Sequence, residues 1–232
     1  MTPERYQRLK AVLNRRQPDL TLLTDNVHKG RNLSAVVRNA DAVGICDMHC
    51  VIDDKDYRAF RGTAMGSHSW VDVHRHTDIA TAISTLKEQG MQVLAAHLDE
   101  DSVDYRQPDY CRPTAILLGA EKRGVSAIGA GLADAHITVP MMGMVKSFNV
   151  SVAAGIILAE AQYQRMQAGL YEACRLSNTH YQRLLFEWAH PGLRDFCRER
   201  GLAYPPLGDD GELLDAPAWN ASVKAGTAEK AG

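Results

Sequence analysis

The stretch that decides the fold is ITVPMMGMVKSFNVSVAAGIILAEA at residues 137–161. Its β-branched opening predicts a buried strand, which Pro140 ends because proline has no amide hydrogen for a neighbouring strand. After a methionine-rich loop, Ser147, Asn149 and Ser151 offer hydroxyl and amide groups at the start of an apolar helix, where helix capping is the simplest interpretation. A strand, a loop and a helix in this order predict one unit of an open α/β sheet.

Short β-rich runs alternate with helical patterns on the amino-terminal side of this stretch. The runs predict strands at 20–24, 48–52, 71–74, 91–98, 114–119 and 136–140. We therefore expect a mainly parallel sheet with helices on both faces. One intervening helix is expected to be capped by Asn32 and ended by Gly44, and another to be capped by Thr77.

Amphipathic helices with arginine-rich outer faces are expected on either side of the sheet region. They lie at residues 6–17, 149–169, 181–190 and 193–200. The residues after Tyr204 have the Pro, Gly, Ala and charge content of a poorly ordered tail.

The net charge averages over segments of different sign. The 232 residues carry 26 Lys and Arg against 28 Asp and Glu, a net charge of -2 that excludes a strongly basic or a disordered acidic chain. Residues 1–38 carry +5, residues 39–160 carry -6, residues 161–208 carry +2 and residues 209–232 carry -3. Two basic segments therefore flank an acidic middle.

Neither a membrane span nor a metal site is predicted. No apolar run approaches the roughly 18 residues that a span requires, and the start MTPERYQRLK is polar, so we expect a cytoplasmic protein. The five cysteines form no paired CxxC spacing. Cys46, His49 and Cys50 are close in sequence but lack a fourth ligand, which favours structural thiols over metal ligands.

Two further segments place chemically useful groups where strands meet loops. In NLSAVVRNADAVG, residues 32–44, Arg38 stands among alanines and valines, so it needs an anionic partner or lines a cleft. A phosphate or carboxylate clamp and a structural ion pair remain equal alternatives for it. In ILLGAEKRG, residues 116–124, Gly119 and Gly124 permit close backbone approach. The segment matches neither a phosphate loop nor GxGxxG, which weakens nucleotide-triphosphate and dinucleotide interpretations.

These three segments, in this order, resemble the three motifs of the SpoU branch of the SPOUT methyltransferases. The resemblance extends through the opening RYQRLKAVLNRRQPDLTLL and the arginine-rich C-terminal helices, over roughly residues 1–205. It implies a parallel α/β sheet with a C-terminal deep trefoil knot at about 114–160. The implied segments are a helical extension at 1–18, a catalytic domain at 19–168, a second helical extension at 169–204 and a flexible tail at 205–232.

The same resemblance implies transfer of a methyl group from S-adenosylmethionine to the ribose 2'-hydroxyl of guanosine-18 in the D-loop of tRNA, by a homodimer. Arg38 would stabilise the developing alkoxide, because a guanidinium stays protonated and cannot itself act as a base. The implied supporting polar groups are Asn32, Glu121, Ser147 and Asn149. The implied donor-binding residues are Ala96, Gly119, Val139, Met144 and Phe148. The implied tRNA-binding residues are Arg5, Arg8, Arg15, Arg16 and Arg38.

Two alternative functions remain open. Ribosomal RNA ribose methylation is the first, although related enzymes often carry a separate RNA-binding domain and only 31 residues precede Asn32 here. A noncatalytic RNA-binding protein of the same fold is the second. The presence of Arg38, Glu121, Ser147 and Asn149 together argues against it.

Overall fold

The computed structural model describes residues 1–52, 69–121 and 123–231. The chain forms two compact units: one contains Arg16–Ala173, and the other combines Met1–Arg15 with Cys174–Gly232. The segments expected at the two ends of the chain therefore belong to one unit. We call the first the sheet unit and the second the helical unit.

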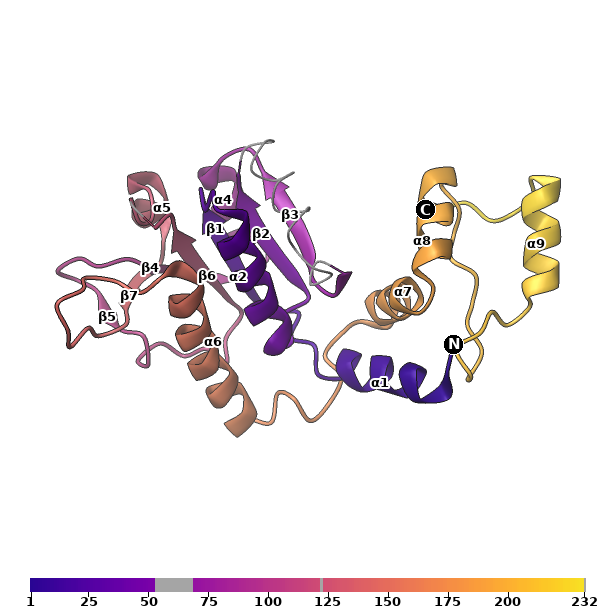
Figure 1. Cartoon of the computed structure of the whole chain (residues 1–232), viewed down its shortest axis with the longest axis horizontal. Coiled ribbons are helices and arrows are strands. Elements are labelled where there is room, and N and C mark those ends of the chain that lie inside the picture. Colours follow the sequence, from indigo (N-terminus) through magenta and orange to yellow (C-terminus); the bar gives the residue numbers. More distant parts are fainter. Residues whose placement is uncertain (53–68, 122, 232) are drawn as a thin grey trace. The chain divides into compact units, whose positions relative to one another are not determined.

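The sheet unit contains a seven-stranded sheet in which every paired strand runs parallel to its neighbour (Figure 1). The strand order is β3-β2-β1-β6-β4-β7-β5. Its strands are β1 (Leu20–Asp25), β2 (Asp47–Val51), β3 (Asp72–His76), β4 (Gln92–Ala96), β5 (Val103–Asp104), β6 (Thr114–Gly119) and β7 (Ala135–Thr138). The six expected strands are present within a few residues, while the short edge strand β5 lacks an apolar run and escaped prediction.

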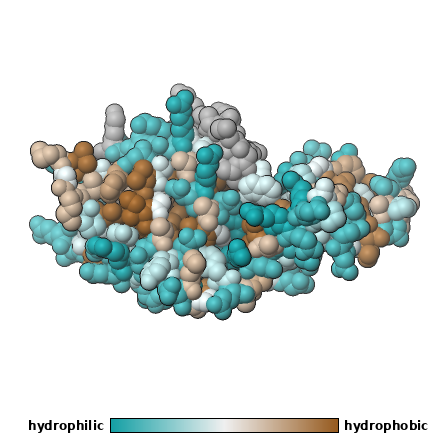
Figure 2. Space-filling view, turned by 60° about the horizontal axis from the view of Figure 1, so that its bottom comes forward, coloured by the Kyte–Doolittle hydropathy of each residue, from teal (hydrophilic) through white to brown (hydrophobic). Residues whose placement is uncertain are grey.

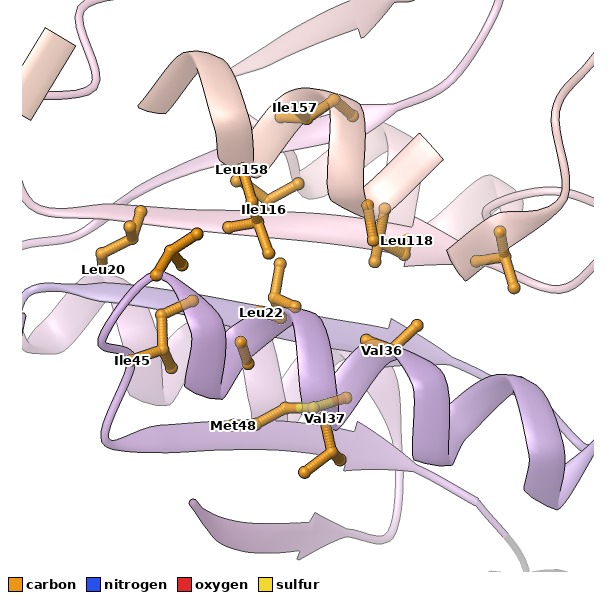
Figure 3. Packing of buried hydrophobic residues seen from close by; sticks show 14 of the residues in the cluster. Leu20, Leu22, Val36, Val37, Ile45, Met48, Ile116, Leu118, Ile157 and Leu158 are labelled. Carbon is orange, nitrogen blue, oxygen red and sulfur yellow. The ribbon is translucent and has the colours of Figure 1, made fainter. Parts of the chain in front are cut away.

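Helices cover both faces of this sheet. They are α2 (Gly30–Ala42), α4 (Ile79–Glu88), α5 (Ala127–Leu132) and α6 (Val150–Gln167). One core places α2 and α6 on the face that carries Leu22 and Ile116 (Figure 3). A second core packs α4 on the opposite face, against Leu23 and Leu117. The central strands β1 and β6 are buried on both faces, which explains their nearly continuous apolar sequences.

Two helix starts differ from the predicted ones. Helix α2 begins at Gly30, and Lys29 occupies the capping position without a side-chain hydrogen bond, so Asn32 lies inside the helix. Helix α4 is capped by Asp78 rather than Thr77, because the Asp78 carboxylate accepts the Thr81 amide at 2.8 Å. Because Asn32 does not cap α2, its side-chain amide is available for contacts with other segments.

Two arginines that were expected on outer surfaces are buried at the amino edge of the sheet. Arg16 donates to Asp41 Oδ1 at 2.7 Å and to the carbonyl oxygens of Ile45 and Trp70, both at 2.9 Å. Arg165 donates to Asp19 Oδ1 at 2.7 Å and to further oxygens in the loops before β1 and β6. Because a guanidinium carries five donors, each side chain ties together loops that precede different strands. Arg16 is therefore not exposed for phosphate binding, which corrects the expectation for this residue.

The helical unit is built from α1 (Pro3–Leu13), α7 (Asn178–Ala189), α8 (Pro191–Arg200) and α9 (Ala216–Ala225). Tyr6, Leu9 and Leu13 supply the buried side of α1. The segment after residue 205 is ordered instead of a loose tail: Asp215 caps α9 and Gly226 ends it in the left-handed conformation, with φ 71°. A Cβ at Gly211 would come within 2.5 Å of the Tyr6 ring, so this segment packs directly on α1. The Pro and Gly content that suggested disorder forms tight turns between packed elements.

Cys46 and Cys50 are buried, and burial raises the pKa of the Cys50 thiol to about 12, so the thiol stays protonated. Among the residues that the structure describes, no group of three His, Cys, Asp or Glu side chains is placed to hold a metal ion. No helix in the same ranges is long and apolar enough to cross a membrane.

A buried histidine on β2 predicts a pH dependence of stability. Burial and the nearby His74 and His76 lower the pKa of His49 from 6.5 to about 4. Below pH 6.5 the unfolded chain therefore binds a proton that folded His49 does not bind, and stability falls as the pH drops toward 4. Between pH 7 and pH 5 the loss is expected to be about 2 kcal/mol in urea unfolding. His49→Gln is expected to remove most of this loss; an unchanged pH dependence in the variant would contradict the assignment.

Candidate active site

The carboxyl ends of the central strands form the edge at which the three sequence segments meet. Asp25 of β1 is in register with Gly119 of β6, and Ala96 of β4 is in register with Leu118 beside it. The loops that follow these strands therefore emerge side by side. Open parallel sheets bind ligands at this edge.

A tight turn follows β6 and requires glycine at both of its ends. Ala120 and Gly124 exchange two backbone hydrogen bonds of 3.0 and 2.7 Å, and Gly124 has a φ of +67°. A Cβ added to Gly119 would lie 1.9 Å from the Gly124 carbonyl carbon and 2.0 Å from the Val125 nitrogen. The end of β6 and the segment after the turn are thus in direct backbone contact, as the two glycines predicted.

A cavity of about 350 Å³ lies next to this turn. We call it the donor cavity, because residues expected to bind the methyl donor line it. Four of the five residues expected at the methyl donor line it, namely Ala96, Gly119, Val139 and Phe148. Met144 is not among its lining residues and is fully exposed, so the expectation for Met144 is not met. The volume falls in the range of roughly 300–1,000 Å³ that is usual for small-molecule sites.

Other residues line the same cavity without having been predicted. Sequence reasoning missed Met141, Lys146, Ala153 and Ile157. All four belong to the segment quoted first, where the sequence had pointed to the Ser and Asn groups and the resemblance had implied Val139, Met144 and Phe148. Treating the whole segment 137–161 as one wall of the cavity would have identified them.

Two asparagines join the first and third segments. Asn149 caps α6, accepting the Ser151 amide at 2.9 Å, and its own amide nitrogen lies 3.4 Å from Asn32 Oδ1 on α2. Asn39 of α2 also donates to the Ser151 carbonyl at 2.7 Å. Asn149 therefore has two roles: it caps α6, and it also contacts Asn32 in the first segment. These contacts hold the helix that carries Arg38 against the amino end of α6.

Glu121 and Ser147 lie on the lining of the donor cavity. Glu121 Oε2 pairs with Lys29 Nζ at 2.5 Å, whereas its Oε1 is buried and has no hydrogen-bond partner in the described part of the chain. Ser147 is exposed. Glu121 thus pairs with a lysine of the loop before α2.

Arg38 is exposed on α2, and the buried side of that helix is formed by Leu33, Val36, Val37 and Ala40. Within residues 1–52, 69–121 and 123–231, no hydrogen bond or ion pair occupies its guanidinium. Of the two alternatives left open by the sequence, the structural ion pair is therefore not formed. Arg38 is also absent from the lining of the donor cavity of its own chain.

An exposed apolar stripe runs along α6 and continues into the loop before it. Val152, Tyr163 and Met166 are 47%, 60% and 58% exposed at helical spacing, with Ile156 half-buried between them. Met142 and Met144 are almost completely exposed in the loop. The space-filling view shows brown apolar surface gathered over the sheet unit, on the left of the molecule (Figure 2). We call Val152, Ile156, Tyr163 and Met166 the α6 stripe.

Comparison with known proteins decides the family. The model described as the SpoU rRNA methylase family matches residues 19–159, and the corresponding C-terminal model matches residues 163–216. The chain belongs to the SpoU methylase family. All three segments of the site begin inside the first match. The parallel sheet covered by helices is the fold of this family, which confirms the expected fold class.

Family members resemble the chain over most of its length. The Escherichia coli protein named tRNA (guanosine(18)-2'-O)-methyltransferase is 47% identical over 97% of this chain and 99% of its own. The Thermus thermophilus protein of the same name is 51% identical over 81% of this chain and 96% of its own. The crystal structure of the A. aeolicus TrmH/SpoU tRNA modifying enzyme has a TM-score of 0.76 at 39% identity, covering 81% of this chain and 96% of that one.

The donor cavity suits the methyl donor of this enzyme class, S-adenosylmethionine. A family member, AviRb from Streptomyces viridochromogenes, has been solved with this cofactor and is 25% identical, with a TM-score of 0.58 over 65% of this chain and 62% of its own. In this chain, the bare backbone at Gly119 admits a polar ligand closely, and Ala96, Val139 and Phe148 offer apolar walls for an adenine ring. The residues that line the donor cavity therefore fit S-adenosylmethionine.

Proposed function

We propose that this chain is a cytoplasmic tRNA (guanosine-18-2'-O)-methyltransferase that uses S-adenosylmethionine. The observation that carries the proposal is the similarity to enzymes of that name over 97% of the chain, which includes both the sheet unit and the helical unit. The donor cavity at the carboxyl edge and the exposed Arg38 on α2 supply the chemistry. Ribosomal RNA methylation is less well supported, because the Vibrio parahaemolyticus 23S rRNA methyltransferase RlmB is 36% identical over only 68% of this chain.

A ribose hydroxyl is a poor nucleophile, so the enzyme must stabilise the negative charge that develops on its oxygen. When bound, S-adenosylmethionine supplies a methyl group on a positively charged sulfur. Arg38 binds the phosphate next to the target ribose and stabilises negative charge as it develops on the 2'-oxygen. The departing proton passes to that phosphate or to water, because a guanidinium has no free lone pair to accept it. The contacts of Asn149 with Asn32 and Ser151 keep α2 and α6 in the arrangement that this requires.

The proposal includes a knotted chain at about 114–160. Strand β7 lies beyond β4 in the sheet, yet α6, which follows β7, returns to pack beside β6 and α2. A chain that crosses back over its own earlier segment supports threading of the kind found in SPOUT enzymes.

The direct test is transfer of a labelled methyl group to an unmodified tRNA transcript, followed by mapping of the labelled nucleotide. We expect label only at the ribose of the D-loop guanosine, with no label in ribosomal RNA fragments. Label at another nucleotide would contradict the assignment. Calorimetry with S-adenosylmethionine tests the noncatalytic alternative, which predicts no binding.

A homodimer forms part of the proposed function, and the α6 stripe is its interface. In the first half of α6, residues 150–159, the one polar side chain is Ser151. Ala154, Ile157 and Leu158 face the core while Val152 and Ile156 of the stripe face outward. An apolar outer face indicates a surface that is covered, and a second copy of the chain would cover it. Arg38 does not line its own donor cavity, so it would complete the cavity of the second copy.

A charge in the α6 stripe is expected to break the dimer and the activity together. Ile156→Asp is expected to convert the protein to a monomer in analytical ultracentrifugation and to reduce methyl transfer at least tenfold, because a buried unpaired carboxylate is costly. Ala80→Asp places the same charge at an exposed position of α4 and serves as the control. A fully active monomeric Ile156→Asp variant would refute the shared site.

Exposed arginines of the helical unit are expected to bind the tRNA backbone. Arg5, Arg8 and Arg15 are all exposed, and their combined replacement by alanine is expected to weaken tRNA binding and to reduce its salt slope by about two to three. The affinity for S-adenosylmethionine is expected to stay unchanged. Arg16→Ala is the contrasting variant: loss of a buried guanidinium should lower the unfolding temperature rather than the salt slope. An unchanged salt slope in the triple variant would contradict this role.

A further inference from the structure

A second cavity opens at the same edge of the sheet, and the proposed reaction does not yet use it. Its volume is about 560 Å³. It lies between the end of β1 at Asp25 with the loop that follows to Lys29, on one side, and the turn after β6 on the other. Four residues of that turn line this cavity and the donor cavity as well: Ala120, Glu121, Arg123 and Gly124. A ligand in the second cavity would therefore touch the wall of the donor site.

The floor of this cavity is held in place by Asp25. Its Oδ2 accepts the Ser126 amide at 2.8 Å, and its Oδ1 accepts the Asn26 side-chain amide at 2.8 Å. Asn26 has a left-handed backbone, with φ 56°, and donates its own amide to Val51. Both oxygens of the buried Asp25 are thus occupied by the protein. Asp25 shapes the cavity and is not available to a ligand.

Glu121 and Lys29 instead present an unused acceptor beside an unused donor. Glu121 Oε1 is buried and unpartnered among the described residues, while Oε2 holds Lys29 Nζ at 2.5 Å. A buried carboxylate oxygen without a donor is costly, so a ligand N–H is the natural partner for Oε1. The Lys29 ammonium has three donors, its side chain is 70% exposed, and one donor satisfies Glu121. The pair therefore matches a ligand with adjacent N–H and C=O groups.

Among the two purine bases of RNA, guanine has this pattern. Its N1–H donor stands next to its O6 acceptor, whereas adenine has an acceptor at N1 and a donor at N6. Enzymes that act on a displaced nucleotide read such groups through the Watson–Crick edge. We propose that the second cavity receives the guanine base of the target nucleotide, with Glu121 Oε1 accepting from N1–H and Lys29 Nζ donating to O6. The proposal rests on the proposed function and adds the residues that select guanine.

The test compares tRNA transcripts that carry guanosine, inosine or 2-aminopurine riboside at position 18. Inosine keeps N1–H and O6 but lacks the 2-amino group, and 2-aminopurine lacks N1–H and O6. The wild-type protein is expected to methylate guanosine and inosine about equally and 2-aminopurine with a kcat/KM lower by about 10–100-fold. In Lys29→Met and Glu121→Gln, the ratio of guanosine to 2-aminopurine is expected to fall toward one. Arg31→Met, an exposed neighbour outside the cavity lining, is expected to keep the wild-type ratio.

The outcomes separate this inference from the proposed function. If wild-type protein labels guanosine-18 but does not discriminate against 2-aminopurine, the base assignment fails and the methyltransferase assignment stands. If Lys29→Met and Glu121→Gln lower kcat/KM equally for guanosine and 2-aminopurine, so that the ratio of the two stays at the wild-type value, the roles of these residues are structural and the inference is overturned. If no tRNA is labelled at guanosine-18, the proposed function fails first. Calorimetry with S-adenosylmethionine checks that each variant retains a folded donor cavity.

Discussion

Arg38→Ala is expected to lower kcat/KM for tRNA methylation by roughly 10²–10³-fold, the usual cost of removing one donor that stabilises a developing oxyanion. The affinity for S-adenosylmethionine is expected to stay unchanged, because Arg38 acts on the tRNA phosphate and the ribose 2'-oxygen and is not one of the residues that form the walls around the donor. The fold should also be unaffected, since the side chain is exposed and joins no ion pair in the described part of the chain. Single-turnover methyl transfer, calorimetry and thermal unfolding measure the three quantities.

Two companion variants sharpen the assignment of Arg38. Arg31→Ala removes another exposed arginine from the same helix and is expected to have little effect on the chemical step. Arg38→Lys keeps the charge but loses the planar fork that contacts a phosphate and an oxyanion together, so activity should remain low. Near-normal activity of Arg38→Lys would show that a point charge suffices and would contradict the need for a bidentate donor.

Gly119→Ala is expected to weaken the binding of S-adenosylmethionine by about 100-fold. The new Cβ would lie within 2.2 Å of three backbone atoms of Gly124 and Val125, and no flexible side chain is there to move away. Overpacking of this kind lowers the free energy of unfolding by about 1–3 kcal/mol at ordinary core sites. The backbone that must move here also lines the donor cavity, and a loss of about 3 kcal/mol in binding free energy corresponds to about a 100-fold loss of affinity. Calorimetry measures the lost binding, and thermal unfolding measures the accompanying loss of stability.

Gly143 offers a matched control in the loop before α6. A Cβ at Gly143 meets no atom within 4 Å, so Gly143→Ala is expected to bind S-adenosylmethionine normally. Equal affinities for the two variants would show that the contact at Gly119 does not shape the donor site. Loss of binding in Gly119→Ala alone would tie the glycine to the close approach of the two backbone segments.

Local patterns predicted most of the sheet unit because each acts over a few residues. The buried runs of β1 and β6 are apolar on both faces, and the helices between the strands carry one apolar side. Weak local signals explain the misses: β5 has two residues, and α9 follows a Pro- and Gly-rich segment whose turns resemble disorder. Asn32 and Thr77 could cap a helix by residue type, but each actual start lies elsewhere.

Residue type did not reveal which arginines are exposed. Arg15 and Arg16 are adjacent, yet Arg15 is exposed and Arg16 is enclosed by carbonyl oxygens from the loops before β2 and β3. Arg38 was expected beside a buried face and lies on the outer side of α2. In each case the environment depends on segments that are distant in sequence, so only the folded chain decides it.

The sequence by itself determined the parallel sheet, the three site segments and the need for glycine at residues 119 and 124, since backbone preference and apolar periodicity are local properties. Only the tertiary structure decided which polar groups meet: Asn32 with Asn149, Glu121 with Lys29, and a buried oxygen of Glu121 with no partner among the described residues. Those pairings join strands and loops that are distant in the sequence, and they follow from strand order, which brings the carboxyl ends of β1, β4 and β6 together.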